Sequence, residues 1–331
     1  MHSFDEARAR LDAIPQLQVT CNEPLAAHVR FGFGGPARVF ADTADEAAFL
    51  AALGVAHGSG LAWLVIGSGT NLIVSDKGFP GIVLRYRGAR ISRAGQTVRV
   101  EAGAALQSLV DFAVAEALQG IEVMTGIPGN VGAAVYGNAG AYGASISDRI
   151  SSVRFHDGLA VREVDHAGCR FRYRDSIFKQ RRLQGEPWLI LSAELTFPNG
   201  DGAAMKAKAD AILATRNAKF PPEMKCAGSI FKNLLLSELP EQARRAVPES
   251  VVKGGKVPAA WFLEQAGAKG LAMGGIRVTD YHSNTLYNAG GGTAAEFCGL
   301  VRTLKGRVLE RFGLALSEEV QYIGFDPEEL P

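Results

Sequence analysis

The chain has 331 residues, more than one ordinary hydrophobic core supports, which predicts two or three domains. With 47% hydrophobic and 21% charged residues it has the composition of a soluble globular protein. The 35 basic and 34 acidic residues nearly cancel, so no overall field would recruit nucleic acid or an anionic membrane. An anionic ligand would have to be held by local groups.

Targeting and metal signals are not evident in the sequence. The first 15 residues are charged where a secretory signal is apolar, and no apolar run reaches the ~18 residues of a spanning helix. We therefore expect a cytoplasmic protein without membrane insertion. The histidines do not fall at metal-ligand spacing, so we expect no metal site. The cysteines are far apart and are expected to be reduced thiols: Cys21, Cys169, Cys226 and Cys298.

The first predicted unit is strand, helix, strand. Residues 37–41 form an apolar run, and Thr43 and Glu46 match a capping box that predicts a helix over 44–55 with Thr43 as N-cap. Residues 63–66 read as a buried strand. This order predicts a parallel βαβ unit.

A loop of small residues follows the second strand directly. Residues 67–72 read G-S-G-T-N-L, and open α/β units place ligands at the carboxyl ends of strands. The G-x-G-x-x-G pattern fails at Leu72, and no G-x-x-x-x-G-K-[ST] occurs. A Rossmann dinucleotide fold and a P-loop are both disfavoured.

The segment 126–143 is the richest in glycine and reads G-I-P-G-N-V-G-A-A-V-Y-G-N-A-G-A-Y-G. A packed helix or strand gains nothing from such a pattern. Glycine permits φ > 0 and close approach, and successive backbone N–H groups can form a concave nest for an anion. We predict a cradle for a diphosphate, facing the 67–72 loop across a cleft. A structural glycine loop is the alternative.

The remaining elements follow from hydrophobic periodicity, turn residues and glycine stops. Strands are expected at 81–86, 97–101, within 150–197, at 276–278 and at 314–323, and helices at 105–118, 203–218, 259–266 and 294–312. Residues 198–202 are the clearest linker, and 234–256 form a polar stretch.

Polar residues at three places could carry chemistry. Arg174 lies in an aromatic setting and could clamp a carboxylate with two hydrogen bonds, although an ion pair with Asp175 is an equal alternative. Ser229 could present a hydroxyl on a tight turn or be an ordinary turn residue, and it is not part of G-x-S-x-G. Glu318 and Glu319 are neighbours in an expected strand and would face opposite sides, so which one points inward stays open.

Several motifs together resemble the UDP-N-acetylenolpyruvoylglucosamine reductase (MurB) family. They are residues 67–72, 126–143, 173–176 (Y-R-D-S), 228–233 (G-S-I-F-K-N) and 318–320 (E-E-V), in family order over residues 20–324. The resemblance implies an α+β chain with an FAD-binding type fold of two small α/β subdomains, like vanillyl-alcohol oxidase and PCMH proteins, and a C-terminal α+β substrate-binding domain. We place these parts at 1–86, 87–200 and 201–331.

The resemblance also implies the reaction. FAD would be bound non-covalently and reduced by NADPH, the co-substrate. The enolpyruvyl ether of UDP-N-acetylenolpyruvoylglucosamine would then be reduced to UDP-N-acetylmuramate in peptidoglycan precursor synthesis. The partner is a UDP-sugar, and no nucleic acid and no obligate protein partner are expected.

The family's site residues carry over by position. Arg174 would pair with the enolpyruvyl carboxylate, Ser229 would protonate C2, and Glu319 would orient and polarise the site. Cofactor contacts are implied for Gly67, Ser68, Gly69, Thr70, Asn71, Leu72, Gly126, Ile127, Pro128, Gly129, Gly132, Ala133, Asn138, Gly140 and Tyr142. Substrate contacts are implied for Tyr173, Lys219, Lys232, Asn233 and His282, with a structural histidine as the alternative for His282.

The chain departs from the family pattern in two regions. Longer members carry a tyrosine loop after the flavin domain, whereas residues 199–217 contain no aromatic residue. Leu234 stands where proline is frequent, and the inserted residues 235–256 have no derived role.

Two other functions remain open from the sequence. One is an FAD oxidase of the same flavin fold that passes electrons to oxygen. The other is a non-enzymatic sugar-nucleotide or phosphate binder that uses the glycines as an anion nest.

Overall fold

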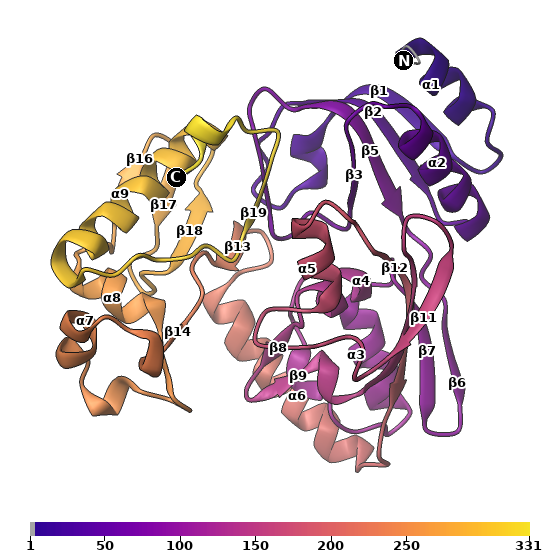
Figure 1. The fold of residues 1–331 in the computed structure, drawn as a ribbon. Helices are drawn as coiled ribbons and strands as arrows, with labels where there is room; N and C mark the ends of the chain where they lie inside the picture. The colour runs from indigo at the N-terminus through magenta and orange to yellow at the C-terminus, as the bar shows by residue number, and fades with distance from the viewer. Residues whose placement is uncertain (1–3) are drawn as a thin grey trace. The chain divides into compact units, whose positions relative to one another are not determined.

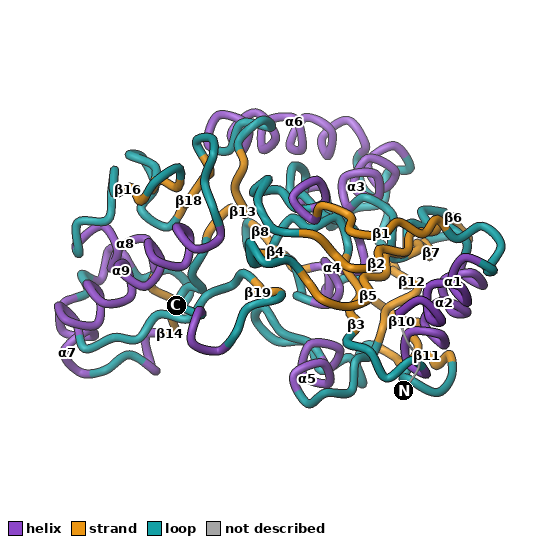
Figure 2. The backbone as a smooth tube through the Cα atoms, turned by 90° about the horizontal axis from the view of Figure 1, so that it is seen from above, coloured by secondary structure: helices purple, strands orange, loops and turns teal. Residues whose placement is uncertain are grey.

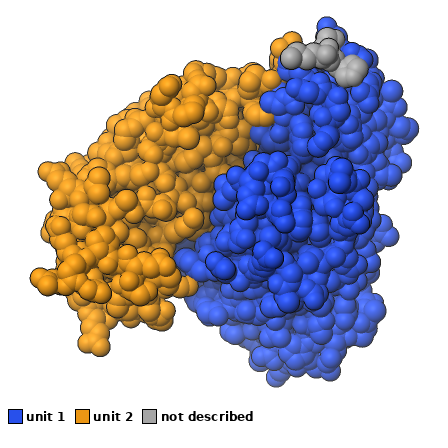
Figure 3. Space-filling view, viewed as in Figure 1, with its two compact units in different colours: residues 1–21, 39–68, 81–222 blue, residues 22–38, 69–80, 223–331 orange. Residues whose placement is uncertain are grey.

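A computed structural model describes residues 4–331, a mixture of helices and mostly short strands (Figure 1). The chain separates into two compact units (Figure 3). Unit 1 comprises the chain up to residue 21 with 39–68 and 81–222, and unit 2 comprises 22–38, 69–80 and 223–331. The boundaries at 86/87 and 200/201 stay a prediction.

The first sheet of unit 1 has the strand order β1-β2-β5-β3. Its elements are β1 (Gln18–Pro24), β2 (Pro36–Thr43), β5 (Phe79–Tyr86) and β3 (Trp63–Ile66), with helices α1 (Phe4–Asp12) and α2 (Glu46–Gly58). The helices lie side by side (Figures 1 and 2), and their apolar faces share a core with the sheet that includes Leu11, Phe49, Ile82 and Leu84. β3 is parallel to β5, which lies between β3 and β2 in the sheet. The neighbour of β3 in the sheet is therefore β5, which follows β3 in the sequence, and not β2, which precedes it.

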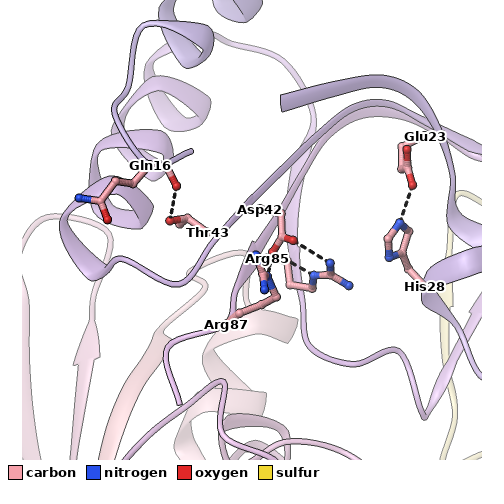
Figure 4. A network of polar contacts seen from close by, with 7 residues as sticks. All are labelled: Gln16, Glu23, His28, Asp42, Thr43, Arg85 and Arg87. Carbon is pink, nitrogen blue, oxygen red and sulfur yellow. Dashed lines mark hydrogen bonds and ion pairs between the residues drawn. The ribbon is translucent and has the colours of Figure 1, made fainter. Parts of the chain in front are cut away.

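The predicted N-cap of α2 is wrong. The Asp45 carboxylate accepts from the Ala48 N–H at 2.8 Å and caps the helix. Thr43 is the last residue of β2, and its hydroxyl donates to the Gln16 carbonyl at 2.8 Å (Figure 4). Glu46 does not reach back to the cap, because it forms two 2.6 Å hydrogen bonds with Arg154.

The second sheet of unit 1 is antiparallel, with the order β11-β10-β12-β7-β6. Its strands are β6 (Ile91–Ala94), β7 (Thr97–Glu101), β10 (Ile150–His156), β11 (Val161–Asp165) and β12 (Leu189–Thr196), with helices α3 (Leu106–Ala115), α4 (Val131–Tyr136), α5 (Ile177–Leu183) and α6 (Gly202–Lys219). A separate apolar core that includes Leu109, Val131, Val153 and Phe178 lies here. The expected alternating strand pattern over 150–197, broken at Gly158 and Gly168, missed α5, which Ser176 caps by accepting from the Lys179 N–H.

The glycine-rich segment contains regular structure, contrary to expectation. Helix α4 lies inside it, and β8 (Gly140–Ala141) pairs with β9 (Ala144–Ser145). Gly132 is within α4, and a Cβ there would lie 2.9 Å from the Cβ of Ala102. This glycine is explained by close packing of the helix. Helix α3 ends three residues earlier than predicted, ahead of Ala117, which has φ +54°.

Unit 2 contains the antiparallel sheet β13-β18-β17-β16 and two small strand pairs, β4–β19 and β14–β15. Its elements are β4 (Leu72–Val74), β13 (Lys225–Ser229), β14 (Leu234–Leu235), α7 (Glu241–Ala246), β15 (Lys256–Val257), α8 (Ala259–Gln265), β16 (Ala272–Met273), β17 (Ile276–Val278), β18 (Thr285–Asn288), α9 (Ala294–Phe312) and β19 (Gln321–Ile323). Phe31, Phe262 and Phe297 are buried in its core. The Asp76 carboxylate accepts from Ala294 N–H and Ala295 N–H, both at 3.0 Å, which joins the 69–80 segment to the start of α9.

The expected strand over 314–323 is largely wrong. Only β19 is a strand, and Glu318 forms an isolated bridge with Phe231. Leu314 and Leu316 do alternate into the core, but no neighbouring strand pairs with them in the described chain. The premise that Glu318 and Glu319 alternate within a strand is therefore also wrong. No helix within residues 4–331 is long and apolar enough to cross a membrane.

Candidate active site

The start of the first predicted glycine loop meets the second at Gly67 and Asn130, both in unit 1. A Cβ added to Gly67 would lie 2.6 Å from Oδ1 of Asn130, the N-cap residue of α4. Any side chain at Gly67 would therefore force the loops apart. The close approach explains why this position after β3 requires glycine.

Gly126 opens the second loop with φ +72°, and its N–H donates to Oε1 of Gln107 at 2.6 Å. A Cβ there would lie 3.1 Å from Leu213 Cδ1 and 3.2 Å from Arg216 Cδ. Gly129 also has positive φ, at +124°. The loop is thus a tight backbone bend that borders the last turns of α6.

Arg174 lies at the tip of a two-residue turn. Arg172 and Asp175 exchange backbone hydrogen bonds at 3.0 and 3.2 Å, and Arg174 has φ +56°. The buried Asn138 holds this turn, because its amide donates to the Arg172 carbonyl at 2.9 Å. The Arg174 guanidinium donates to the Gly140 carbonyl at 3.3 Å, which brings it to the glycine-rich segment.

Backbone strain gathers at this site. Of the seven non-glycine residues with positive φ in the described chain, three are predicted site residues, Asn138 (+44°), Tyr142 (+52°) and Arg174 (+56°). Each such residue costs about 1 kcal/mol or more, and strain of this kind persists where the surrounding structure over-determines it, often at functional sites.

Three cations approach one another in unit 1. Burial lowers the pKa of Arg216, and the nearby Arg174 lowers it further, whereas Tyr142 acts in the opposite direction. Burial, then Arg216, lowers the pKa of Lys219. The Nε of Arg216 is buried and has no hydrogen-bond partner among the described residues. Because like charges repel and a buried donor needs an acceptor, this cluster is suited to an anion.

Ser229 ends β13 in unit 2, opposite Thr285 of β18. The register shifts between Cys226 and Ser229, and Gly228 has φ +76°, so the strand bends just before the serine. The half-buried Ser229 is therefore a residue at an irregular strand end. The direction of the Ser229 side chain therefore depends on contacts other than the regular pairing of β13 with β18.

The two neighbouring glutamates differ in their surroundings. Oε1 of Glu318 forms an ion pair with Lys305 at 3.0 Å. The backbone of Glu319 is held on both sides, because its N–H donates to the Ile230 carbonyl at 2.7 Å and its carbonyl accepts from Nδ2 of Asn71 at 2.9 Å. Glu319 is thus tied directly to the residue after Ser229.

The predicted site residues fall into both units. Unit 1 holds Arg174, Tyr173, Lys219, Gly67, Ser68 and the cofactor candidates between Gly126 and Tyr142, and unit 2 holds Gly69, Thr70, Asn71, Leu72, Ser229, Lys232, Asn233, His282 and Glu319. Within unit 1 the structure brings Arg174, Lys219 and the glycine loops together, and within unit 2 it brings Asn71, Glu319 and the Ser229 loop together.

Two substrate candidates have structural contacts of their own. His282 Nδ1 lies 2.9 Å from the Thr285 hydroxyl, in a turn that Thr279 also closes. Asn233 Oδ1 accepts from the Ala259 N–H at 3.3 Å, at the start of α8. These contacts fix both side chains in place and leave their role toward a ligand a prediction.

Sequence reasoning missed Arg216, Gln107 and Asn284. Arg216 is near the end of the expected helix 203–218 and three positions before Lys219, a spacing that places both on one face because α6 continues to Lys219. For Gln107 and Asn284 the signal is tertiary, because their partners are distant in the chain. In residues 4–331, no group of three or more His, Cys, Asp or Glu side chains is arranged to hold a metal ion.

Comparison with known proteins identifies the family. A model described as an FAD binding domain matches residues 37–159, and one described as the C-terminal domain of UDP-N-acetylenolpyruvoylglucosamine reductase matches residues 220–323. The UDP-N-acetylenolpyruvoylglucosamine reductase of Solibacter usitatus (strain Ellin6076) is 56% identical over 315 residues, which is 95% of this chain and 100% of that protein. This chain belongs to the UDP-N-acetylenolpyruvoylglucosamine reductase family.

Other members of the UDP-N-acetylenolpyruvoylglucosamine reductase family are also similar to this chain. The Heliobacterium modesticaldum (strain ATCC 51547 / Ice1) protein is 35% identical over 91% of this chain and 90% of its own length. The crystal structure of the Thermus caldophilus reductase (MurB) matches with a TM-score of 0.70 and 25% identity, over 93% of this chain and 98% of that one. The predicted resemblance and the α+β fold with an FAD-binding part and a C-terminal family domain are confirmed.

The residues present in unit 1 fit FAD. The cofactor brings a diphosphate, and the bare backbone at Gly67 and Gly126 lets the loops approach Asn130 and Arg216 closely, with no side chain of their own in the way. The unpaired buried Nε of Arg216 lies next to the second bend and supplies a donor for an anionic oxygen.

Proposed function

We propose that this chain is an FAD-dependent, NADPH-using reductase of UDP-N-acetylenolpyruvoylglucosamine, which forms UDP-N-acetylmuramate for peptidoglycan synthesis. The observation that carries the proposal is the meeting of the two glycine loops with the Arg174, Arg216 and Lys219 cluster in a chain of this family. Because the nucleotide substrates are cytoplasmic, we place the enzyme in the cytoplasm.

FAD, when bound, supplies the hydride chemistry, and NADPH is the reductant. Gly67 and Gly126 shape the bends that would hold its diphosphate, and Arg216 would neutralise it. The exposed Tyr142 lies close enough to Arg216 to affect the pKa of Arg216, and it would cover the FAD diphosphate from solvent.

Arg174 has the electrostatic role. Hydride addition to C3 of the enolpyruvyl group leaves negative charge at C2, which is shared with the adjacent carboxylate. The guanidinium can hold both carboxylate oxygens with parallel hydrogen bonds and so stabilises the enolate. One preorganised donor of this kind contributes about 3 kcal/mol in other enzymes.

Ser229 has the proton-transfer role. Its Oγ donates a proton to C2 and completes the reduction of the double bond. Serine is a weak acid in water, but a carbanion-like centre is a strong base, so a positioned hydroxyl is sufficient. Glu319 orients the site, and we assign Tyr173, Lys219, Lys232, Asn233 and His282 to the substrate.

The absorbance spectrum of the purified protein tests the function. We expect a yellow flavin spectrum that NADPH bleaches without oxygen and that UDP-N-acetylenolpyruvoylglucosamine then restores. Reoxidation by oxygen alone would indicate an FAD oxidase. Colourless protein that gains no flavin spectrum with added FAD would leave a non-enzymatic binder of phosphate or sugar nucleotides.

A further inference from the structure

Asn284 makes an unusual set of contacts for a residue with no assigned role. Its side chain is 1% exposed. Oδ1 accepts from the Phe231 N–H at 2.8 Å, and Nδ2 donates to the Phe231 carbonyl at 2.8 Å. Its own backbone carbonyl accepts from the Ile230 N–H at 2.9 Å. Asn284 therefore fixes both residues that directly follow Ser229.

Ile230 and Lys232, on either side of Phe231, hold the segment of Glu319. The Ile230 carbonyl accepts from the Glu319 N–H at 2.7 Å, and the Lys232 N–H donates to the Ser317 carbonyl at 3.0 Å. Asn284 thus reaches Glu319 through Ile230 alone. A displacement at Asn284 would be transmitted to both candidate catalytic residues of unit 2.

Strand pairing supplies only part of this restraint, because Ser229 lies opposite Thr285 but the pairing is interrupted just before it. The register of β13 against β18 shifts between Cys226 and Ser229, and Gly228 has a left-handed conformation. A strand end after such a bend can turn its side chain in more than one direction. A side chain that binds both the N–H and the C=O of one residue fixes the direction of that peptide segment, because each group must meet its own partner.

We propose that Asn284 is a positioning residue for the reductase, setting the direction of the Ser229 hydroxyl and the backbone position of Glu319 together. The inference rests on the proposed function of Ser229. This role requires an uncharged side chain that accepts from the Phe231 N–H and donates to the Phe231 carbonyl. Asparagine meets it, whereas leucine of similar size leaves the N–H and the carbonyl without partners.

Asn288 provides a matched control. It lies in the same strand, β18, and is buried, but its amide donates to the Phe31 carbonyl at 2.8 Å and its Oδ1 accepts from the N–H groups of Gly290 and Gly292, both at 3.0 Å. Loss of the Asn288 side chain removes a similar set of hydrogen bonds without touching the Ser229 loop.

The first experiment compares Asn284→Leu with Asn288→Leu in the FAD-loaded protein by stopped flow. In Asn284→Leu we expect flavin reduction by NADPH within about 2-fold of wild type. Reoxidation by UDP-N-acetylenolpyruvoylglucosamine should slow by about 10- to 100-fold, because small misplacements of reacting groups have effects of that size. Asn288→Leu should keep wild-type reoxidation. Wild-type reoxidation in Asn284→Leu, or an equal loss in both variants, would overturn the inference.

The second experiment measures backbone hydrogen exchange without substrate. Deuterium uptake by peptides covering residues 229–233 should rise in Asn284→Leu and stay at the wild-type level in Asn288→Leu. Unchanged uptake in Asn284→Leu contradicts the inference whatever the substrate is. Wild-type flavin that the UDP-sugar fails to reoxidise would instead contradict the proposed function.

Asn284→Asp tests the donor requirement and does not depend on the leucine variant folding. A protonated carboxyl both donates and accepts like the amide, whereas an ionised one only accepts and repels the Phe231 carbonyl. Burial raises the pKa of a carboxyl. Reoxidation by substrate in Asn284→Asp should therefore accelerate at least about 5-fold relative to wild type as the pH falls from about 8 to 5.5. A pH profile parallel to wild type would overturn the inference.

Discussion

At the scale of single residues, the site combines strain with charge. Arg174 holds a left-handed backbone conformation at φ +56° and lies near a second arginine, both of which are unfavourable without a ligand. Asn138 and the Arg172–Asp175 backbone pair maintain the strained turn. The fold thus holds a cation, at some loss of stability, where an anion is to bind.

Replacing Ser229 with alanine should separate the two half-reactions. We expect Ser229→Ala to bind the UDP-sugar and to accept electrons from NADPH at the wild-type rate. Reoxidation by substrate should fall by at least about 100-fold, because general acid catalysis typically contributes that much. Single-turnover absorbance at the flavin band measures both rates. Flavin reoxidation at the wild-type rate would refute Ser229 as the proton donor.

The shape of the Arg174 side chain should matter as much as its charge. Arg174→Lys keeps the positive charge and a Cβ in the same backbone conformation, so its effect on folding should be small. The ammonium cannot form two parallel hydrogen bonds to a carboxylate, and kcat/KM should fall by about 100-fold. Steady-state kinetics measure this. A loss below about 3-fold would show that a point charge suffices.

At the scale of elements, the Gly126 bend determines whether the cofactor fits. Gly126 and Gly143 both have positive φ, +72° and +84°, so alanine is strained at either position. A Cβ at Gly126 would contact Leu213 and Arg216 within 3.2 Å, whereas a Cβ at Gly143 would have nothing within 4 Å. The pair therefore separates backbone strain from obstruction of the loop.

We expect Gly126→Ala to lower FAD affinity by at least about 10-fold, since Arg216 and the loop must shift to admit the methyl group. Gly143→Ala should lose stability by about 1 kcal/mol and keep its FAD affinity. Titration of the apoprotein with FAD, followed by flavin fluorescence, measures the affinities. Equal FAD affinity in the two variants would argue against a cofactor role for the Gly126 bend.

At the scale of the whole molecule, buried charge links stability to pH. The buried Asp42 carboxylate of β2 accepts from Arg85 at 2.8 and 3.1 Å and from Arg87 at 2.8 Å (Figure 4). Burial acts to raise the pKa of Asp42, but the hydrogen bonds and charges of the two arginines outweigh it, and the net shift is downward. A lowered pKa in the folded state stabilises the protein above the unfolded pKa of about 3.9 and loses that effect as the pH falls through the folded value.

Asp42→Asn should therefore be less stable than wild type by about 2 kcal/mol at pH 7. The difference should shrink as the pH falls below about 4, because Asp42 is protonated first in the unfolded state and in the folded state only at lower pH. Urea unfolding over a pH series measures this. Asp210→Asn is the control, since Asp210 and its partner Lys206 are 60% and 68% exposed and should contribute little at any pH. A difference that persists unchanged at pH 3 would contradict the assignment.

Local signals in the sequence placed several elements closely. Helix α9 begins and ends at the predicted residues because Thr293 and Glu296 form a capping box and Gly313 takes the left-handed conformation that stops a helix. Strand β17 also matches, since its alternation and the glycines around it are short-range features. The motif order identified the family for the same reason, because each motif is contiguous in the chain.

Tertiary contacts decided what those signals left open. Asp45 caps α2 in place of Thr43 because β2 runs through Thr43 and directs its hydroxyl to Gln16. The segment before β19 packs on the core and bridges to Phe231 without becoming a strand, and only there do Glu318 and Glu319 acquire different partners. The sequence by itself determined the family, the boundaries of locally capped elements and the residue types available for catalysis. The cation cluster and the Asn284 contacts required the fold, because charge repulsion and paired amide hydrogen bonds depend on distances between residues far apart in the chain.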